Sequence, residues 1–310
     1  MQHRALPGQY DFLRRLQAAP DASASAALIA IAFAILFYQP FEMLLRDWLS
    51  LPEAGHGLLM APIAIWLAWR TGRHPNAAGQ VWVGTGILVF AVVMRYASGL
   101  AAEFFTMRVS MGLALVGLTV YFASVRQVLY WWLPFVLVFL SIPFPELVTQ
   151  ALALPLQFKA SQMGASLLEM RRVPVLLSGN IIRLPGQELF VTEACSGLRS
   201  LTALLSLAVL FGAVLLKTPI ARIVLLAFAV PIAILINGVR VFLTGFLVYY
   251  VSPEFGKGFM HASEGWLLFL VSLAGLGGLA AIGGWVERRL WKRTRQDGDS
   301  RLVLGGPHAS

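Results

Sequence analysis

Long apolar runs separated by short polar or basic segments dominate the hydropathy pattern of the chain. Runs of this kind are typical of helices that cross a membrane. Charged, glycine and proline residues divide the runs, so we expect about eight transmembrane helices in an all-α polytopic membrane protein. The expected spans are residues 26–45, 58–69, 81–94, 107–122, 128–142, 198–216, 221–251 and 265–285.

The longest run, residues 221–251, contains the interruption Asn237-Gly238-Val239-Arg240 and is compatible with one helix or two. At a rise of about 1.5 Å per residue, Arg222 and Arg240 lie about 27 Å apart along a helix, close to the hydrocarbon thickness of a bilayer. We therefore predict one long helix, from which Arg240 emerges at the face opposite Arg222.

Residues 146–194 have a different pattern. Residues 152–170 interleave apolar and polar positions at helical spacing, which predicts an interfacial amphipathic helix. Residues 173–191 alternate around Ser178-Gly179-Asn180, which predicts a β-hairpin of two short strands. We expect this insert, about residues 146–196, to be a small extracytoplasmic domain that leads the backbone to Cys195.

Composition and charge agree with a membrane protein. Hydrophobic residues make up 58% of the chain, charged residues 13%, and the mean hydropathy is +0.74. With both termini in the cytoplasm, 14 of the 24 Lys and Arg and 5 of the 15 acidic residues lie on the cytoplasmic side. The other side then holds 10 of each, so the whole net charge of +9 falls where positive-inside bias requires it. The basic excess thus predicts orientation, not nucleic-acid binding.

This topology divides the chain into three parts. We expect a cytoplasmic basic tail with a short surface helix over residues 1–24, a transmembrane domain over residues 25–286 and a second cytoplasmic basic tail over residues 287–310. No small-residue cleavage site clearly follows the first apolar run, so we expect no cleavable signal peptide.

The chain has a single cysteine, Cys195, which excludes an intrachain disulfide and a cysteine-cluster metal site. It lies in a polar stretch directly before the span 198–216. A helix N-terminus favours negative charge, and the thiolate is the nucleophilic form of cysteine. Two interpretations remain open from this stretch alone: a reactive thiol, or a small packing residue, as unpaired cysteines commonly are.

Three further residues with useful chemistry reach the same extracytoplasmic face in this topology: Arg240, His261 and His56. An ionisable residue in an apolar span is costly and commonly functional, and Asn237 shares the helical face of Arg240. A thiolate attacks a carbonyl, a histidine protonates the leaving amine, and an arginine holds the thiolate or the oxyanion. This set of groups suits acyl transfer through a thioester.

Structural interpretations stand beside each of these. Arg240 can extend to lipid headgroups or pair with Glu193 or Glu264, His261 can act as an interfacial cap, and His56 can be structural or position a substrate. Two histidines without further ligands at motif spacing do not make a metal site, so we expect no metal and no cofactor. A transporter or a scaffold of an exopolysaccharide export system is the alternative class, because intramembrane charges and broken helices are common in transporters.

The chain resembles the exosortases, polytopic cysteine transpeptidases of Gram-negative bacteria, over about residues 40–285. The motifs that carry the resemblance are E-A-C-S-G-L-R-S at 193–200, N-G-V-R at 237–240 and H-A-S-E-G-W at 261–266. Weaker supports are G-H-G-L-L at 55–59 after Trp48, S-I-P-F-P-E at 141–146 and S-G-N-I-I-R-L at 178–184. The family's second-loop motif usually reads Tyr-Ser-His-Gly, whereas Ala54 and Gly55 stand before His56 here.

The resemblance implies a catalytic set of Cys195, Arg240 and His261. It implies that the substrates are exported proteins whose C-terminal sorting signal has a Pro-Glu-Pro motif, a membrane span and a basic tail. The enzyme would cut near the motif at the periplasmic face of the inner membrane and transfer the protein to an unknown acceptor nucleophile. Glu193, Arg199, Asn237 and His56 are supporting candidates; Arg199 either lowers the pKa of the thiol or pairs with Glu193.

Overall fold

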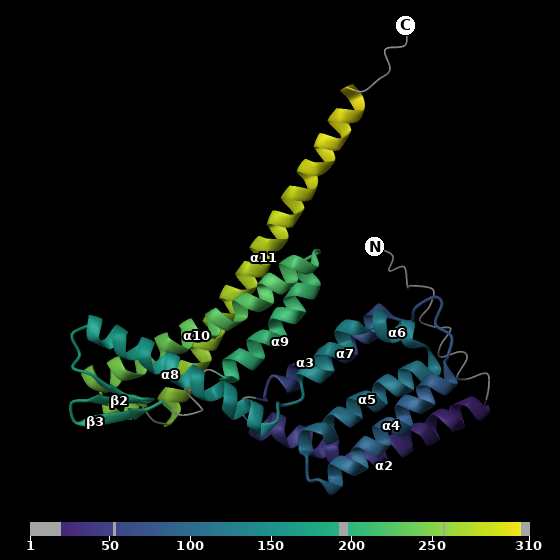
Figure 1. Ribbon diagram of the computed structural model, residues 1–310, viewed down its shortest axis with the longest axis horizontal. Coiled ribbons are helices and arrows are strands. Elements are labelled where there is room, and N and C mark those ends of the chain that lie inside the picture. Colours follow the sequence, from purple (N-terminus) through teal and green to yellow (C-terminus); the bar gives the residue numbers. More distant parts are fainter. Residues whose placement is uncertain (1–19, 52–53, 192–197, 257, 305–310) are drawn as a thin grey trace, which may run out of the picture. The chain divides into compact units, whose positions relative to one another are not determined.

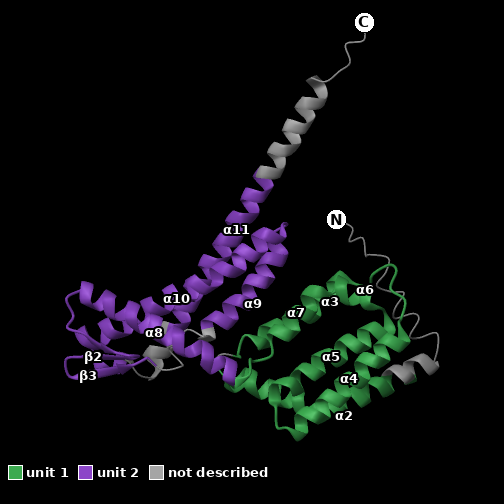
Figure 2. Ribbon diagram, in the orientation of Figure 1, with its two compact units in different colours: residues 1–146 green, residues 147–310 purple. Residues whose placement is uncertain are grey.

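The computed structural model describes residues 20–51, 54–191, 198–256 and 258–304; within them the side chains at 20–23, 25–26, 198–199, 258–264 and 290–304 lie outside the description. The expected surface helix near the N-terminus therefore falls mostly outside the described residues. The chain is mainly helical and divides into two compact units, residues 1–146 (unit 1) and 147–310 (unit 2), coloured separately in Figure 2.

Unit 1 consists of helices alone among its described residues (Figure 1). Close packing of α4 against α5 requires Gly84, because a side chain there would collide with the backbone of Tyr121. The Glu103 side chain caps the start of α5 by accepting hydrogen bonds from the backbone N–H groups of Phe105 and Thr106. The helices are α2 (Pro20–Ser50), α3 (Gly57–Thr71), α4 (Val81–Leu100), α5 (Phe104–Phe122), α6 (Val125–Tyr130) and α7 (Trp132–Leu140).

The expected span over residues 128–142 is not one helix, because the chain breaks at Trp131 between α6 and α7. Pro134 has no N–H to donate to the carbonyl of Tyr130, so the helical ladder is interrupted at this point. The indole Nε1 of Trp131 donates to the carbonyl of Gly72 at 2.8 Å, which ties the break to the end of α3.

Unit 2 contains helices and a small antiparallel sheet. The prediction of a single hairpin was incomplete: three strands pair in the order β1-β2-β3. Gly179 (φ +64°) lies in the expected turn, and Gly186 (φ +76°) lies in a second tight turn after Pro185 that sequence reasoning missed. The elements are α8 (Glu146–Met170), β1 (Leu176–Ser178), β2 (Ile181–Leu184), β3 (Gln187–Phe190), α9 (Leu198–Leu215), α10 (Pro219–Tyr250), η2 (Pro253–Gly256) and α11 (Gly258–Leu304).

The prediction of one long helix across residues 221–251 is confirmed by α10. Its first turn carries the expected signals, because the Thr218 hydroxyl accepts from the backbone N–H of Ala221 and Pro219 occupies the first helical position. The last helix is longer at both ends than the expected span 265–285. It begins at Gly258, before His261, and continues to Leu304.

Small residues build the inner face of α8, which contains the helix expected over residues 152–170 and begins six residues earlier. Gly164 packs directly against Val241 of α10, and Gly238 of α10 packs against Met163 of α8. Large apolar residues of α8, including Leu147 and Leu154, are exposed instead. Small residues at a crossing let two backbones approach closely, as they do in membrane helix pairs.

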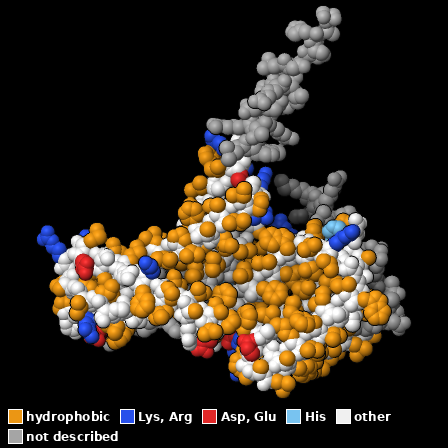
Figure 3. Space-filling view, in the orientation of Figure 1, with side chains coloured by type: hydrophobic (Ala, Val, Ile, Leu, Met, Phe, Trp, Pro, Cys, Tyr) orange, Lys and Arg blue, Asp and Glu red, His pale blue; other side chains and the backbone are white. Residues whose placement is uncertain are grey.

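Among the residues that the structure describes, five helical segments are long and apolar enough to cross a membrane: Ala27–Ser50, Val81–Leu100, Phe104–Phe122, Pro219–Tyr250 and Gly265–Arg289. Helix α3 and the Ser200–Leu215 part of α9 are apolar but shorter, so the count of eight spans is not confirmed and stays a prediction. Apolar side chains cover much of the face shown in Figure 3. Exposed residues such as Trp82, Leu100 and Trp266 suit contact with lipid.

Candidate active site

Residues 192–197, which include Cys195 and are called the cysteine segment here, lie outside the described residues, whereas the chain directly before and after them is described. Cys195 and Glu193 lie outside the described residues, and the side chains of Arg199 and His261 do as well. The structure therefore shows how the backbone is held before and after the cysteine and which residues surround Arg240. The convergence of the predicted catalytic set stays a prediction.

Asn180 anchors the chain where it leaves the sheet toward Cys195. The backbone N–H of Val191 donates to the carbonyl of Asn180 at 3.0 Å, and Asn180 Nδ2 donates back to the carbonyl of Val191 at 3.1 Å. Val191 is only 3% exposed. The residue four positions before the cysteine is therefore fixed by a two-bond clamp and by burial.

The Asn180 side chain also contacts α8. Asn180 Nδ2 also lies 3.4 Å from Oε1 of Gln157, and the Ser161 hydroxyl donates to the carbonyl of Gln157 at 2.8 Å. Gln157 and Ser161 are buried at 6% and 0% exposure. Sequence reasoning identified the Ser-Gly-Asn turn but missed this role. An asparagine in a turn bonds readily to nearby backbone, which was the available signal.

The other end of the cysteine segment enters α9, which is packed into the core of unit 2. Leu201 and Leu204, in the first turns of α9 after residue 200, belong to one buried cluster with Ala229 and Ala233 of α10 and Leu276 of α11. This packing fixes the helix that begins directly after the segment.

Arg240 lies against the first part of α11. A Cβ at Gly265 would stand 3.0 Å from Nη2 and 3.1 Å from Cζ of Arg240, so the guanidinium packs on the glycine backbone. His261 is four residues before Gly265 in the same helix, which is about one turn. The backbone thus places the His261 turn next to the turn that Arg240 contacts. Sequence reasoning did not single out Gly265.

The turn of α10 that carries Arg240 is held from a second side. Asn237, one turn earlier, is 5% exposed, and the adjacent Gly238 packs on Met163 of α8. Asn237 and Arg240 lie three residues apart on the single helix α10, and the supporting role of Asn237 stays a prediction. The backbone of this turn thus packs on α8, while the guanidinium of Arg240 lies against Gly265.

His56 has a structural contact in unit 1. Its Nε2 lies 3.0 Å from the carbonyl oxygen of Leu140, and a carbonyl only accepts, so Nε2 carries the proton in this contact. Trp48 Nε1 donates to the carbonyl of Ser141 at 2.7 Å, and the Trp48 ring packs on Gly57. The segments around residues 48, 56 and 141 thus lie together at the end of α7. The sequence motifs gave no direct evidence of this proximity.

No cluster of three or more His, Cys, Asp or Glu side chains that could hold a metal ion occurs among the described residues. Arg240 supplies a fixed cation with planar donors, and the His261 turn and the cysteine segment belong to the same unit. Such a set can stabilise negative charge on sulfur or oxygen.

Comparison with known proteins identifies a family. Residues 48–278 match a family model described as transmembrane exosortase, which is more than half of the 310-residue chain. A search of curated proteins and a search of solved structures found no match. The match includes the turn of Asn180, the cysteine segment, Arg240 and Gly265.

Proposed function

The chain belongs to the transmembrane exosortase family, and we propose that it is a cysteine transpeptidase that cleaves C-terminal sorting signals of exported proteins. The substrates carry a Pro-Glu-Pro type motif, an apolar span and a basic tail. Cleavage takes place at the periplasmic face of the inner membrane, and an acceptor nucleophile then receives the exported protein.

In this proposal each of three side chains has one task. The thiolate of Cys195 attacks the scissile carbonyl carbon, and the C–N bond breaks as His261 protonates the leaving amine. The thioester that results is attacked by the acceptor, whose proton passes to His261, and the C–S bond breaks to restore the thiolate. Arg240 stabilises the negative charge on sulfur and on the tetrahedral oxygen.

The observation that carries the proposal is the contact between Arg240 and Gly265, one helical turn beyond His261. An arginine that only extended to lipid headgroups would have no need of a glycine facing its guanidinium. The family match covers this contact and the cysteine segment together. Glu193, Arg199 and Asn237 are supporting residues in the proposal, and His56 holds the end of α7.

Replacement of Cys195 tests the function directly. A tagged reporter that ends in the sorting signal is expressed with the wild-type chain, Cys195→Ala or Cys195→Ser, and its cleavage is followed by gel shift. We expect cleavage by wild type alone, with equal amounts of all three proteins in the membrane. Full cleavage by Cys195→Ala would refute the enzyme and favour a transporter or a scaffold.

A trapping experiment tests the thioester. Brief exposure of the wild-type chain to the reporter, followed by acid quenching, should leave a reporter fragment on Cys195 that hydroxylamine releases. If cleavage proceeds while no such adduct accumulates under any quench time, the covalent mechanism is wrong even though the enzyme class stands.

A further inference from the structure

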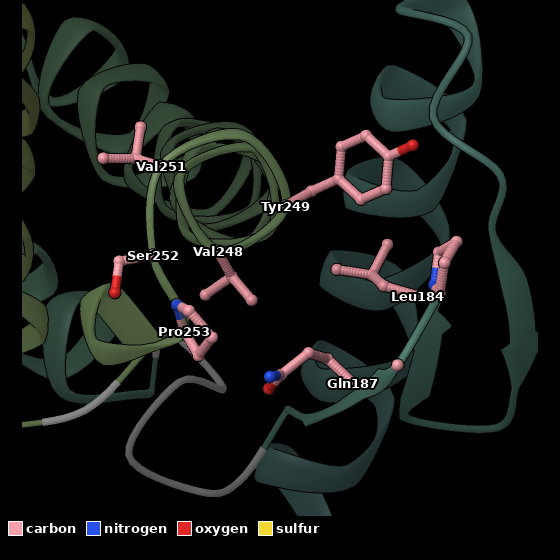
Figure 4. A pocket seen from close by; sticks show the side chains of 9 residues that line it. Leu184, Gln187, Val248, Tyr249, Val251, Ser252 and Pro253 are labelled. Atoms are coloured by element: carbon pink, nitrogen blue, oxygen red, sulfur yellow. The ribbon is translucent and has the colours of Figure 1, made fainter.

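A groove of about 330 Å³ lies in unit 2 between the β2–β3 turn and the C-terminal end of α10 (Figure 4). Val248 and Pro253 line one side, and Leu184 and Gln187 line the other. None of the residues that line it is charged. The groove is therefore suited to an uncharged side chain, with the Gln187 amide as a polar contact.

The outer edge of β3 begins beside this groove. The hydrogen bond from Val191 N–H to Asn180 fixes which residues of β3 face β2, because partners alternate along an antiparallel ladder. Leu189 and Gln187 bond to β2, so the backbone N–H and C=O groups of Glu188 and Phe190 point outward. No described residue pairs with this edge, since β3 is the last strand of the sheet.

The cysteine follows this edge closely along the chain. Phe190 ends β3, and Cys195 follows five positions later. An extended chain spans at most about 3.6 Å per residue, so the Cα atom of Cys195 is at most about 18 Å from that of Phe190. A peptide of about five residues bridges the same distance. A segment bound along β3 can therefore have its next few residues at the thiol.

We propose that the outer edge of β3 and the adjoining groove bind the extended polypeptide that is cleaved, as an added strand. This inference rests on the proposed function. Backbone groups of Glu188 and Phe190 hold the peptide by strand addition, and the groove takes one uncharged side chain. The same sheet then holds the peptide and Val191, the residue directly before the cysteine segment, which Asn180 bonds at the end of β3.

Photocrosslinking locates the peptide. A photoreactive p-benzoylphenylalanine replaces Tyr249 in the groove or, as the control, Leu176 on β1 at the opposite edge of the sheet, each in a Cys195→Ala background that retains uncut reporter. We expect the reporter to crosslink at position 249 at least about fivefold more than at position 176. Equal crosslinking at both positions, or none at 249, overturns the proposal.

A proline substitution tests the edge itself. Glu188→Pro and Glu188→Ala both remove the carboxylate that pairs with Arg183, but only proline removes the outward N–H. We expect the proline variant to cleave the reporter about tenfold more slowly than the alanine variant, as one lost backbone hydrogen bond predicts. The alkylation rate of Cys195 should be equal in the two variants, which shows that the clamp is intact.

The outcomes separate the two proposals. If wild type does not cleave the reporter, the proposed function fails whatever the crosslinks show. If wild type cleaves it while Glu188→Pro equals Glu188→Ala, docking on this edge is wrong and the function stands.

Discussion

Units 1 and 2 both contain an arginine in a largely apolar setting, and the two arginines are held differently. Arg108 of unit 1 is 9% exposed and forms an ion pair with Asp47 that joins α5 to α2. Arg240 of unit 2 instead rests its guanidinium on the backbone of Gly265. The Arg108 pair joins two helices through opposite charges, whereas the Arg240 contact brings a cation against the backbone of α11.

Other polar side chains of the two units also differ in what they hold. In unit 1, Trp48 and His56 both bond to backbone carbonyls at the end of α7 and so fix helix ends. In unit 2, Asn180 bonds to the backbone that leads into the cysteine segment. We infer that substitutions at these contacts of unit 1 act mainly on stability, while substitutions near Arg240 and the cysteine segment of unit 2 act mainly on cleavage.

The largest effect on cleavage is expected for Arg240→Lys. Lysine keeps the charge but loses the planar donors, so the rate should fall about 100-fold or more. The matched control is Arg222→Lys in the same helix, where the guanidinium donates to the carbonyl of Leu216 and an ammonium can do the same. Initial rates of reporter cleavage measure both. Near-normal cleavage by Arg240→Lys would contradict a role in charge stabilisation.

A smaller loss is expected for Gly265→Ala. The added methyl would stand 3.0 Å from Nη2 of Arg240, so the guanidinium must shift, and cleavage should slow about tenfold. Gly275→Ala in the same helix is the control, because no atom lies within 4 Å of its added Cβ. Alanine favours a helix by about 1 kcal/mol over glycine, so neither variant should lose stability. A Gly265→Ala protein that cleaves slowly but is more stable than wild type would show that Gly265 is needed for cleavage and not for the stability of the fold.

Asn180→Ala should have a moderate effect. It removes the donor to the carbonyl of Val191 and to Gln157, a loss of about 1–3 kcal/mol for buried partners. We expect cleavage to slow about threefold to tenfold, together with a changed alkylation rate of Cys195. Ser178→Ala, in the exposed part of the same turn region, should leave both rates as they are. If Asn180→Ala lowers protein yield without altering alkylation, the clamp is only structural.

The smallest effect on cleavage is expected in unit 1. Gly57→Ala would force its methyl into the ring of Trp48 and should destabilise the unit by about 1–3 kcal/mol. Gly86→Ala, with open space around its Cβ, is the control. Thermal unfolding in detergent measures the first effect, and cleavage per folded molecule should stay within about twofold of wild type. A large loss of specific activity in Gly57→Ala would contradict the inference that substitutions in unit 1 act on stability and not on cleavage.

Much of the fold could be predicted from the pattern of apolar and polar residues along the chain. The single helix α10 could be predicted because one span of apolar residues fits one membrane thickness between Arg222 and Arg240. The break at Trp131 was missed although Pro134 marks it, because the run itself is uniformly apolar. The third strand was missed because a four-residue strand is too short to give a clear alternation, even with Pro185-Gly186 before it.

The site could be predicted only in part. Arg240 was identified because a cation is conspicuous among apolar residues. Gly265 and Gln157 have no such signal, since a glycine in an apolar helix and a glutamine on an amphipathic one are ordinary. Their roles come from what lies across from them in space.

The sequence by itself determined the membrane class, the family resemblance and the residue types available for chemistry, because hydropathy and motif spacing are local properties of the chain. Tertiary structure alone decided that Gly265 faces Arg240, that Asn180 holds Val191, and that Trp48 and His56 bond at the end of α7. These pairs are distant along the chain, and only the packing of helices and strands brings them into contact.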